Sequence, residues 1–85
     1  MTARTKDERF ILCLYQEVLR RGEDLELALD RYAVGALAGL QPKGVEAICQ
    51  QLIRANFIRK EDEKQVFLTP HGVKLARQLE EEDER

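Results

Sequence analysis

The sequence has no serine and a single histidine, His71. Without serine there is no carrier for nucleophilic serine chemistry, and no glycine-rich loop of the kind that cradles phosphates is present. His71 stands beside Pro70 in the first turn of a predicted helix, where an exposed, structural side chain is more common than an acid–base catalyst. We therefore expect no enzyme activity, no catalytic residue and no cofactor.

Cysteine is also scarce. The two cysteines, Cys13 and Cys49, lie in apolar surroundings on separate predicted helices, which favours reduced, buried thiols over a disulfide framework. Together with His71 they show no paired ligand spacing, so no metal site is expected. A redox-sensing role for Cys49 is an alternative, but its apolar neighbours Ile48 and Leu52 favour an inert thiol.

Long hydrophobic runs are missing too. No apolar segment approaches the roughly 20 residues that span a bilayer. The N-terminal stretch MTARTKDER has no hydrophobic signal core behind its charges. These absences predict a soluble, cytoplasmic protein with no membrane partner.

The chain has no excess of positive charge. Its 14 basic and 16 acidic residues give a net charge of -2 and a pI of about 5.4. No overall field attracts nucleic acid, so any DNA binding requires a local basic face. The length of 85 residues suits one domain, expected at residues 1–82, with a short acidic tail at 83–85.

The first predicted helix begins near Lys6. Thr5 and Glu8 have the spacing of a capping box, and apolar residues then recur every three or four positions as far as Arg21. Gly22 is expected to end this helix in the left-handed conformation. For residues 23–29 a short strand and an early helix are both open, because the leucines fit both periodicities.

The segment from Asp30 to Thr69 predicts helix, turn, helix and hairpin. Asp30 caps a helix at 31–38, Gly39 makes the turn, and Pro42 opens a helix at 42–55. Asn56 is expected to close that helix in the left-handed conformation. A hairpin follows, with the polar run 59–65 between its strands, and a last helix begins at Pro70. The predicted fold class is mainly α with a small antiparallel hairpin, in the order helix, uncertain strand, helix, helix, strand, strand, helix.

Two stretches carry a resemblance to a known family. LAGLQPKGVEAICQQLIRANFIRK resembles the helix-turn-helix core of bacterial winged-helix regulators, and VFLTPHGVKLARQLEE is similar to their last wing strand and helix. The multiple-antibiotic-resistance type of regulator is the nearest comparison, over roughly residues 25–82. The resemblance implies a winged helix-turn-helix whose recognition helix spans 42–55. Asn56 and Phe57 depart from the usual glycine and leucine, and the tip Glu61-Asp62-Glu63 is acidic where relatives that bind DNA are usually basic.

The helix at 42–55 has an outward face suited to a major groove. If its apolar residues point inward, helical geometry turns Lys43, Glu46, Ala47, Gln50 and Arg54 outward. Lysine and arginine there suit phosphate or guanine, glutamine suits adenine, alanine suits the thymine methyl group, and glutamate accepts from cytosine. The alternative to DNA contact is that these residues form an ordinary solvent-exposed helix face. Weaker candidates flank this face: Gln41, Gln51, Arg59 and Lys60, with Arg4, Lys6 and Arg9 adding phosphate contacts if the fold gathers them.

Two functions follow from these features. The first is a small DNA-binding transcriptional regulator, expected to form a homodimer through its first or last helix so that two recognition helices meet one face of the duplex. The second is a winged-helix module that binds a protein partner, without direct DNA binding, through the acidic wing and tail.

Overall fold

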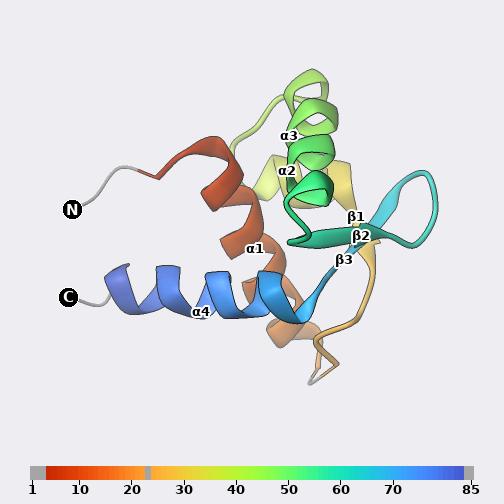
Figure 1. Cartoon of the computed structure of the whole chain (residues 1–85). Helices are drawn as coiled ribbons and strands as arrows, with labels where there is room; N and C mark the ends of the chain where they lie inside the picture. The colour runs from red at the N-terminus through yellow and green to blue at the C-terminus, as the bar shows by residue number, and fades with distance from the viewer. Residues whose placement is uncertain (1–3, 23, 84–85) are drawn as a thin grey trace.

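The computed structural model describes residues 4–22 and 24–83. Its elements follow the predicted order, and the last residue of the ambiguous segment belongs to a two-residue strand (Figure 1). They are α1 (Lys6–Arg21), β1 (Leu29–Asp30), α2 (Arg31–Leu37), α3 (Pro42–Arg54), β2 (Ile58–Lys60), β3 (Gln65–Leu68) and α4 (Pro70–Asp83). The predicted class is confirmed, because the described residues are mainly helical and carry one small antiparallel sheet.

The sheet has three strands in the order β1-β3-β2, and both pairings are antiparallel. The uncertain stretch 23–29 becomes neither a helix nor a full strand. Only its last residue joins the two-residue β1, in which Leu29 pairs with Val66. Residue 23 lies outside the described residues. The alternating leucines therefore reflect a loop that is held by one short pairing.

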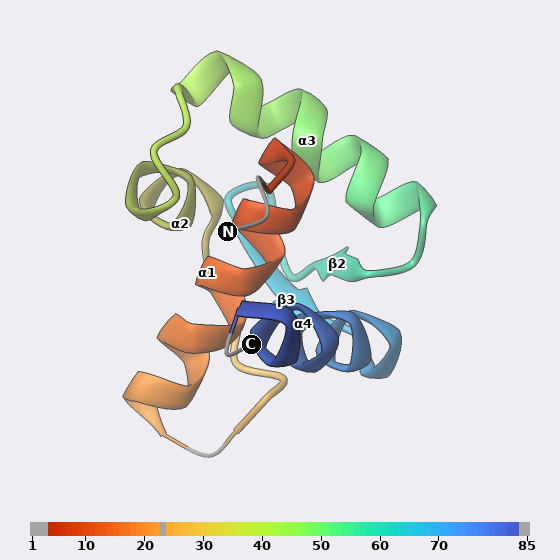
Figure 2. The same cartoon turned by 90° about the vertical axis from the view of Figure 1, so that its left-hand side faces the viewer.

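Helix α1 is the centre of the domain and packs against α2, α3 and α4 (Figures 1 and 2). Both halves of the predicted capping box are present, since Thr5 accepts from the Glu8 amide and Glu8 accepts from the Thr5 amide. The prediction for Gly22 was wrong in its conformation. Gly22 has φ 161° and ψ −160°, an extended backbone, although its N–H still closes the helix on Val18 and Leu19.

The connection from α2 to α3 follows the predicted chemistry. Asp30 accepts hydrogen bonds from the amides of Tyr32 and Ala33, and Gly39 makes the turn with φ 75°. Helix α2 ends at Leu37, one residue earlier than expected. Gly35 allows α3 to approach closely, because a Cβ at this position would lie 2.2 Å from the Val45 side chain.

The end of α3 is tied to the start of α4. Asn56 has φ 65°, as predicted, and so turns the chain from α3 toward β2. The Thr69 hydroxyl donates to the Asn56 carbonyl at 2.5 Å and accepts from the Gly72 amide at 3.0 Å. Thr69 therefore caps α4 and fixes α4 to the α3–β2 corner at the same time.

Candidate nucleic-acid interface

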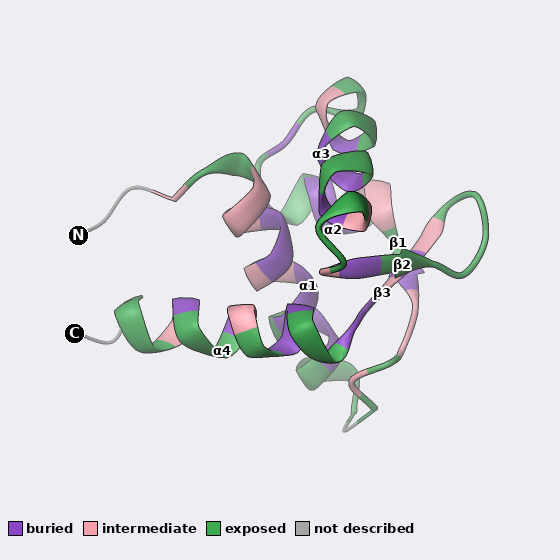
Figure 3. Cartoon of the chain, in the orientation of Figure 1, coloured by how far each residue is buried: buried purple, intermediate pink, exposed green. Residues whose placement is uncertain are grey.

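One face of helix α3 is buried and the opposite face is exposed. Val45, Ile48, Cys49 and Leu52 are buried against the rest of the domain, with Leu52 only 3% exposed. Figure 3 shows the outer side of α3 as exposed. All five residues predicted to point outward are exposed: Lys43, Glu46, Ala47, Gln50 and Arg54. The helix itself ends at Arg54, with Ala55 as its C-cap residue, one residue before the predicted end.

The two flanking glutamines are also accessible. Gln41 is the N-cap residue of α3, yet its side chain makes no capping hydrogen bond. Gln51 is exposed on the same helix. Both amide groups are thus available beside the outward face.

The hairpin carries its basic residues on two different sides. Ile58 is buried, and side chains alternate along a strand, so Lys60 lies on the same face as Ile58 while Arg59 lies on the opposite face. Arg59 pairs across the ladder with Phe67, whereas Lys60 pairs with Val66. Although adjacent in sequence, Arg59 and Lys60 therefore do not share one surface.

The three acidic residues at the tip of the hairpin do not have the same role. The Asp62 carboxylate accepts hydrogen bonds from the amides of Lys64 and Gln65, both at 2.8 Å. These backbone bonds, first that of Gln65 and then that of Lys64, lower the pKa of Asp62 from its ordinary value. Asp62 thus builds the turn, and Glu61 and Glu63 are the acidic side chains left to face a partner.

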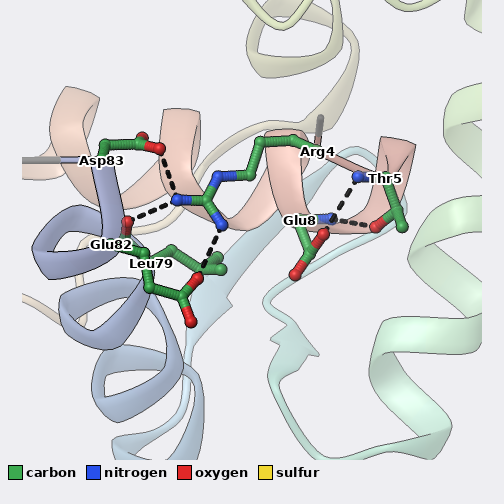
Figure 4. A network of polar contacts seen from close by, with 6 residues as sticks. All are labelled: Arg4, Thr5, Glu8, Leu79, Glu82 and Asp83. Atoms are coloured by element: carbon green, nitrogen blue, oxygen red, sulfur yellow. Dashed lines mark hydrogen bonds and ion pairs between the residues drawn. The ribbon is translucent and has the colours of Figure 1, made fainter. Parts of the chain in front are cut away.

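Arg4 has no free charge to offer to a phosphate. Its guanidinium group binds the C-terminal end of α4, as Figure 4 shows. It pairs with Glu82 at 2.9 Å and with Asp83, and it donates to the Leu79 carbonyl at 2.7 Å. The hydrogen bonds to Glu82 and then Asp83 raise the pKa of Arg4 above its usual value. The condition under which Arg4 would add a phosphate contact, gathering with the other basic residues, is therefore not met.

The start of α1 lies beside α3 on the side away from the hairpin (Figures 1 and 2). Lys6 is exposed there, and Arg9 is partly buried with its Nε lacking an acceptor. The fold therefore places the start of α1, with Lys6 and Arg9, on the side of α3 away from the hairpin (Figure 1), whose two faces carry Arg59 and Lys60. The five basic residues expected to gather do not form one cluster.

Two basic residues outside the predicted set lie next to the hairpin. Lys64 is exposed at the hairpin, and its carbonyl accepts the backbone N–H of Arg31 at 2.8 Å. Lys64 belongs to the polar run that marked the loop, so the sequence carried a signal for it. Arg31 had no such signal, because its position depends on a contact between residues 33 positions apart.

The histidine and the cysteines have structural environments. His71 is exposed and stacks on Phe57, with ring centroids 4.6 Å apart and planes inclined by 8°. Burial raises the pKa of the Cys49 thiol to about 11, although the charge of Arg31 acts in the opposite direction. Cys13 and Cys49 are both free thiols. In the part of the chain that the structure describes, no three His, Cys, Asp or Glu side chains are grouped to hold a metal ion.

Charge is unevenly distributed along the chain. The segment 42–65, which contains α3 and the hairpin, has five basic and four acidic residues, a net charge of +1. Helix α4, residues 70–83, has two basic and four acidic residues, a net charge of −2. The exposed face of α3 thus lies in the more positive part of the domain.

Comparison with protein-family models and with curated proteins finds no match to this chain. Among the described residues, no helix combines the length and apolar character needed to cross a membrane.

Proposed function

We propose that this chain is a winged helix-turn-helix domain that binds duplex DNA, with α3 as the helix that enters the major groove. The proposal rests on one observation: one face of α3 is buried and the opposite face is exposed. A helix that reads DNA needs this division, because it must be held rigidly by its inner face while its outer face reaches base edges. The hairpin beside it is the proposed wing, and a transcriptional regulator is the class of protein that such a domain suits.

The chemistry of the exposed face supports this reading. Lys43 near the start of α3 and Arg54 at its end suit phosphates on either side of a groove. Gln50 between them has the donor and acceptor pair that matches adenine. Glu46 repels phosphate but accepts from the amino group of cytosine, so the proposed contact is selective and sparse.

A single domain with so few positive charges reads only a short site, and we therefore propose a homodimer. Two copies of α3 about 34 Å apart would meet successive turns of the major groove. Leu19 on α1 is 44% exposed and is an apolar side chain that a dimer through α1 would cover. The alternative contact through α4 would bring together two helices that each carry a net charge of −2.

The proposal is tested by fluorescence anisotropy with random and genomic duplexes at several salt concentrations. The double variant Lys43→Ala with Arg54→Ala is expected to weaken binding and to make the salt slope less negative by about 0.9 for each lost phosphate contact. Lys74→Ala with Arg77→Ala on α4 is the matched control, since it removes the same charges elsewhere. No salt-dependent binding at micromolar protein, or equal binding by the two double variants, would refute the proposal.

A protein-interaction module is the second candidate function. Its support is the exposure of Glu61 and Glu63 at the hairpin tip. The acidic tail supports it less, because Glu82 and Asp83 already bind Arg4. Its partner would be basic, so a lysine-rich peptide is a suitable probe.

One variant separates the two candidates. Glu61→Lys with Glu63→Lys reverses the available tip charges and leaves Asp62 in place to form the turn. If the hairpin meets DNA, this variant should bind the duplex more tightly than the wild type. If the tip meets a basic protein, the variant should instead lose affinity for the lysine-rich peptide. Peptide binding that is the same before and after the change would exclude this surface.

A further inference from the structure

Arg31 lies where α2, α3 and the hairpin meet. It is the first residue of α2, and its backbone N–H donates to the Lys64 carbonyl of the hairpin at 2.8 Å. Helix α2 in turn packs against α3. In Figure 1 the first turn of α2 lies on the side of α3 from which the hairpin projects.

The side chain of Arg31 is oriented by its neighbour. The guanidinium carbon lies 5.0 Å from the ring centroid of Tyr32, and Nη2 donates to the Tyr32 hydroxyl at 3.2 Å. Both residues are half-buried. A cation that rests on an aromatic ring loses less conformational freedom when it binds a ligand, because much of its motion is already restricted.

The charge of Arg31 has no carboxylate partner among residues 4–22 and 24–83. Arg4, Arg20 and Arg21 are each paired with an acidic side chain. The Nε of Arg31 is buried and has no hydrogen-bond acceptor.

Other charged groups near this position leave room for an anion. The adjacent carboxylate, Asp30, faces the amides of Tyr32 and Ala33 and is held there as the cap of α2. Lys64, whose carbonyl holds the Arg31 backbone, contributes a second positive charge at the hairpin. Asp62, close to Lys64, likewise faces backbone amides, so this carboxylate and that of Asp30 are both already engaged in hydrogen bonds.

We infer that Arg31 binds a backbone phosphate of the DNA strand that passes between α3 and the hairpin. This inference rests on the proposed DNA binding by α3. When a helix occupies the major groove, the phosphates of the flanking strands lie along its two sides. Arg31 is placed at one of those sides, and its forked donors suit a phosphate better than a single point charge would. The contact positions the domain on the duplex and carries no sequence preference of its own.

The test compares Arg31→Gln and Arg31→Lys with the wild type, and uses Arg77→Gln on α4 as the matched control. Binding to a random duplex of about two helical turns is measured against salt concentration. Arg31→Gln should weaken binding and make the slope less negative by about 0.9, while Arg31→Lys should keep the slope because its charge remains. Arg77→Gln should leave the slope unchanged. Thermal unfolding of each variant confirms that the fold is retained.

A second measurement follows the Arg31 side chain directly in the folded wild type. The Nε–Hε signal of Arg31, assigned by its loss in Arg31→Gln, should move when the duplex is added. Inorganic phosphate at the same phosphate concentration should move it much less, because the duplex is also held by α3. Equal shifts from both would mean that this is a general anion contact, and would overturn the inference.

The outcomes separate the two levels of the proposal. If the wild type binds duplex but Arg31→Gln keeps the full salt slope, Arg31 is not a phosphate contact and the role of α3 stands. If Arg31→Lys reduces the salt slope as much as Arg31→Gln does, duplex binding depends on the packing of Arg31 on Tyr32 and not on its charge. That result also overturns the inference. If the wild type binds no duplex, the proposed function fails and this contact fails with it.

Discussion

At Gly72 the first turn of α4 packs against the backbone just before the hairpin. Replacing Gly72 by alanine tests how closely these two segments approach. A Cβ at Gly72 would lie 2.0 Å from the carbonyl oxygen of Phe57 and 3.0 Å from its carbonyl carbon. The obstacle is backbone rather than the end of a flexible side chain. To bring that oxygen even to 3.0 Å, the two segments would have to separate by at least 1 Å.

The magnitude follows from opposing effects. Alanine is favoured over glycine in a helix by up to about 1 kcal/mol. Overpacking costs about 1–3 kcal/mol, and moving the segments apart also weakens the bond from the Thr69 amide to the Phe57 carbonyl, now 3.1 Å long. Gly72→Ala should therefore lower the free energy of unfolding by about 1–3 kcal/mol, a large part of a small domain's stability.

Gly44 provides the matched control. Like Gly72 it is the third residue of a helix that begins with proline, but a Cβ at Gly44 would meet nothing within 4 Å. Gly44→Ala should raise stability by about 0.4–1 kcal/mol. Urea unfolding followed by circular dichroism measures both variants. If Gly72→Ala were as stable as Gly44→Ala, the close approach of α4 to the Phe57 carbonyl would be wrong.

Three further predictions test the core, the hairpin and the buried thiol. Leu52→Ala should lower the free energy of unfolding by about 2–5 kcal/mol because Leu52 is only 3% exposed, and an unchanged melting midpoint would mean that α3 faces the other way. The pKa of Asp62 is lowered in the folded protein. The stabilisation that its carboxylate gives to the hairpin tip is therefore fully present above the unfolded-state pKa of 3.8, and it is lost as pH falls through the lower folded-state pKa. The amide chemical shifts of Lys64 and Gln65 should follow this transition, and a midpoint at or above 3.8 would contradict the hydrogen bonds to Asp62. Cys49, with a pKa of about 11, should react with a thiol reagent at neutral pH much more slowly in the folded protein than in urea, and equal rates would show that α3 does not bury it.

The parts of the fold that the sequence predicted are those set by local chemistry. Thr5 and Glu8 cap α1, Asp30 caps α2, and Asn56 takes a positive φ, and each of these needs only residues a few positions apart. The segment 23–29 was ambiguous because local periodicity cannot decide a strand that exists only through its pairing with Val66. Gly22 shows a smaller limit of the same kind, since a helix can end with its N–H bonded while the glycine is extended.

In the candidate site, too, local sequence predicts some features and not others. Helical periodicity alone predicted which side of α3 is exposed, because the buried and outward residues alternate within one element. Where Arg4 and Arg31 lie depends on partners distant in sequence. Arg4 meets Glu82 across 78 positions, so no pattern near Arg4 could show that its charge is already used. The same is true of the backbone contact that sets Arg31 against the hairpin.

The net charge of -2 does not describe the field at α3. Arg4 is paired with Glu82 and Asp83, and Glu17 is paired with Arg20 and Arg21, so these three basic and three acidic side chains balance one another. Within the segment 42–65, one of the four acidic residues, Asp62, is turned to backbone amides. At physiological ionic strength charges interact over about 8 Å, so a phosphate beside α3 responds to the groups around it more than to the far end of α4. The relevant quantity is the small local positive balance, which predicts weak, salt-dependent binding by one domain and tighter binding by the proposed homodimer.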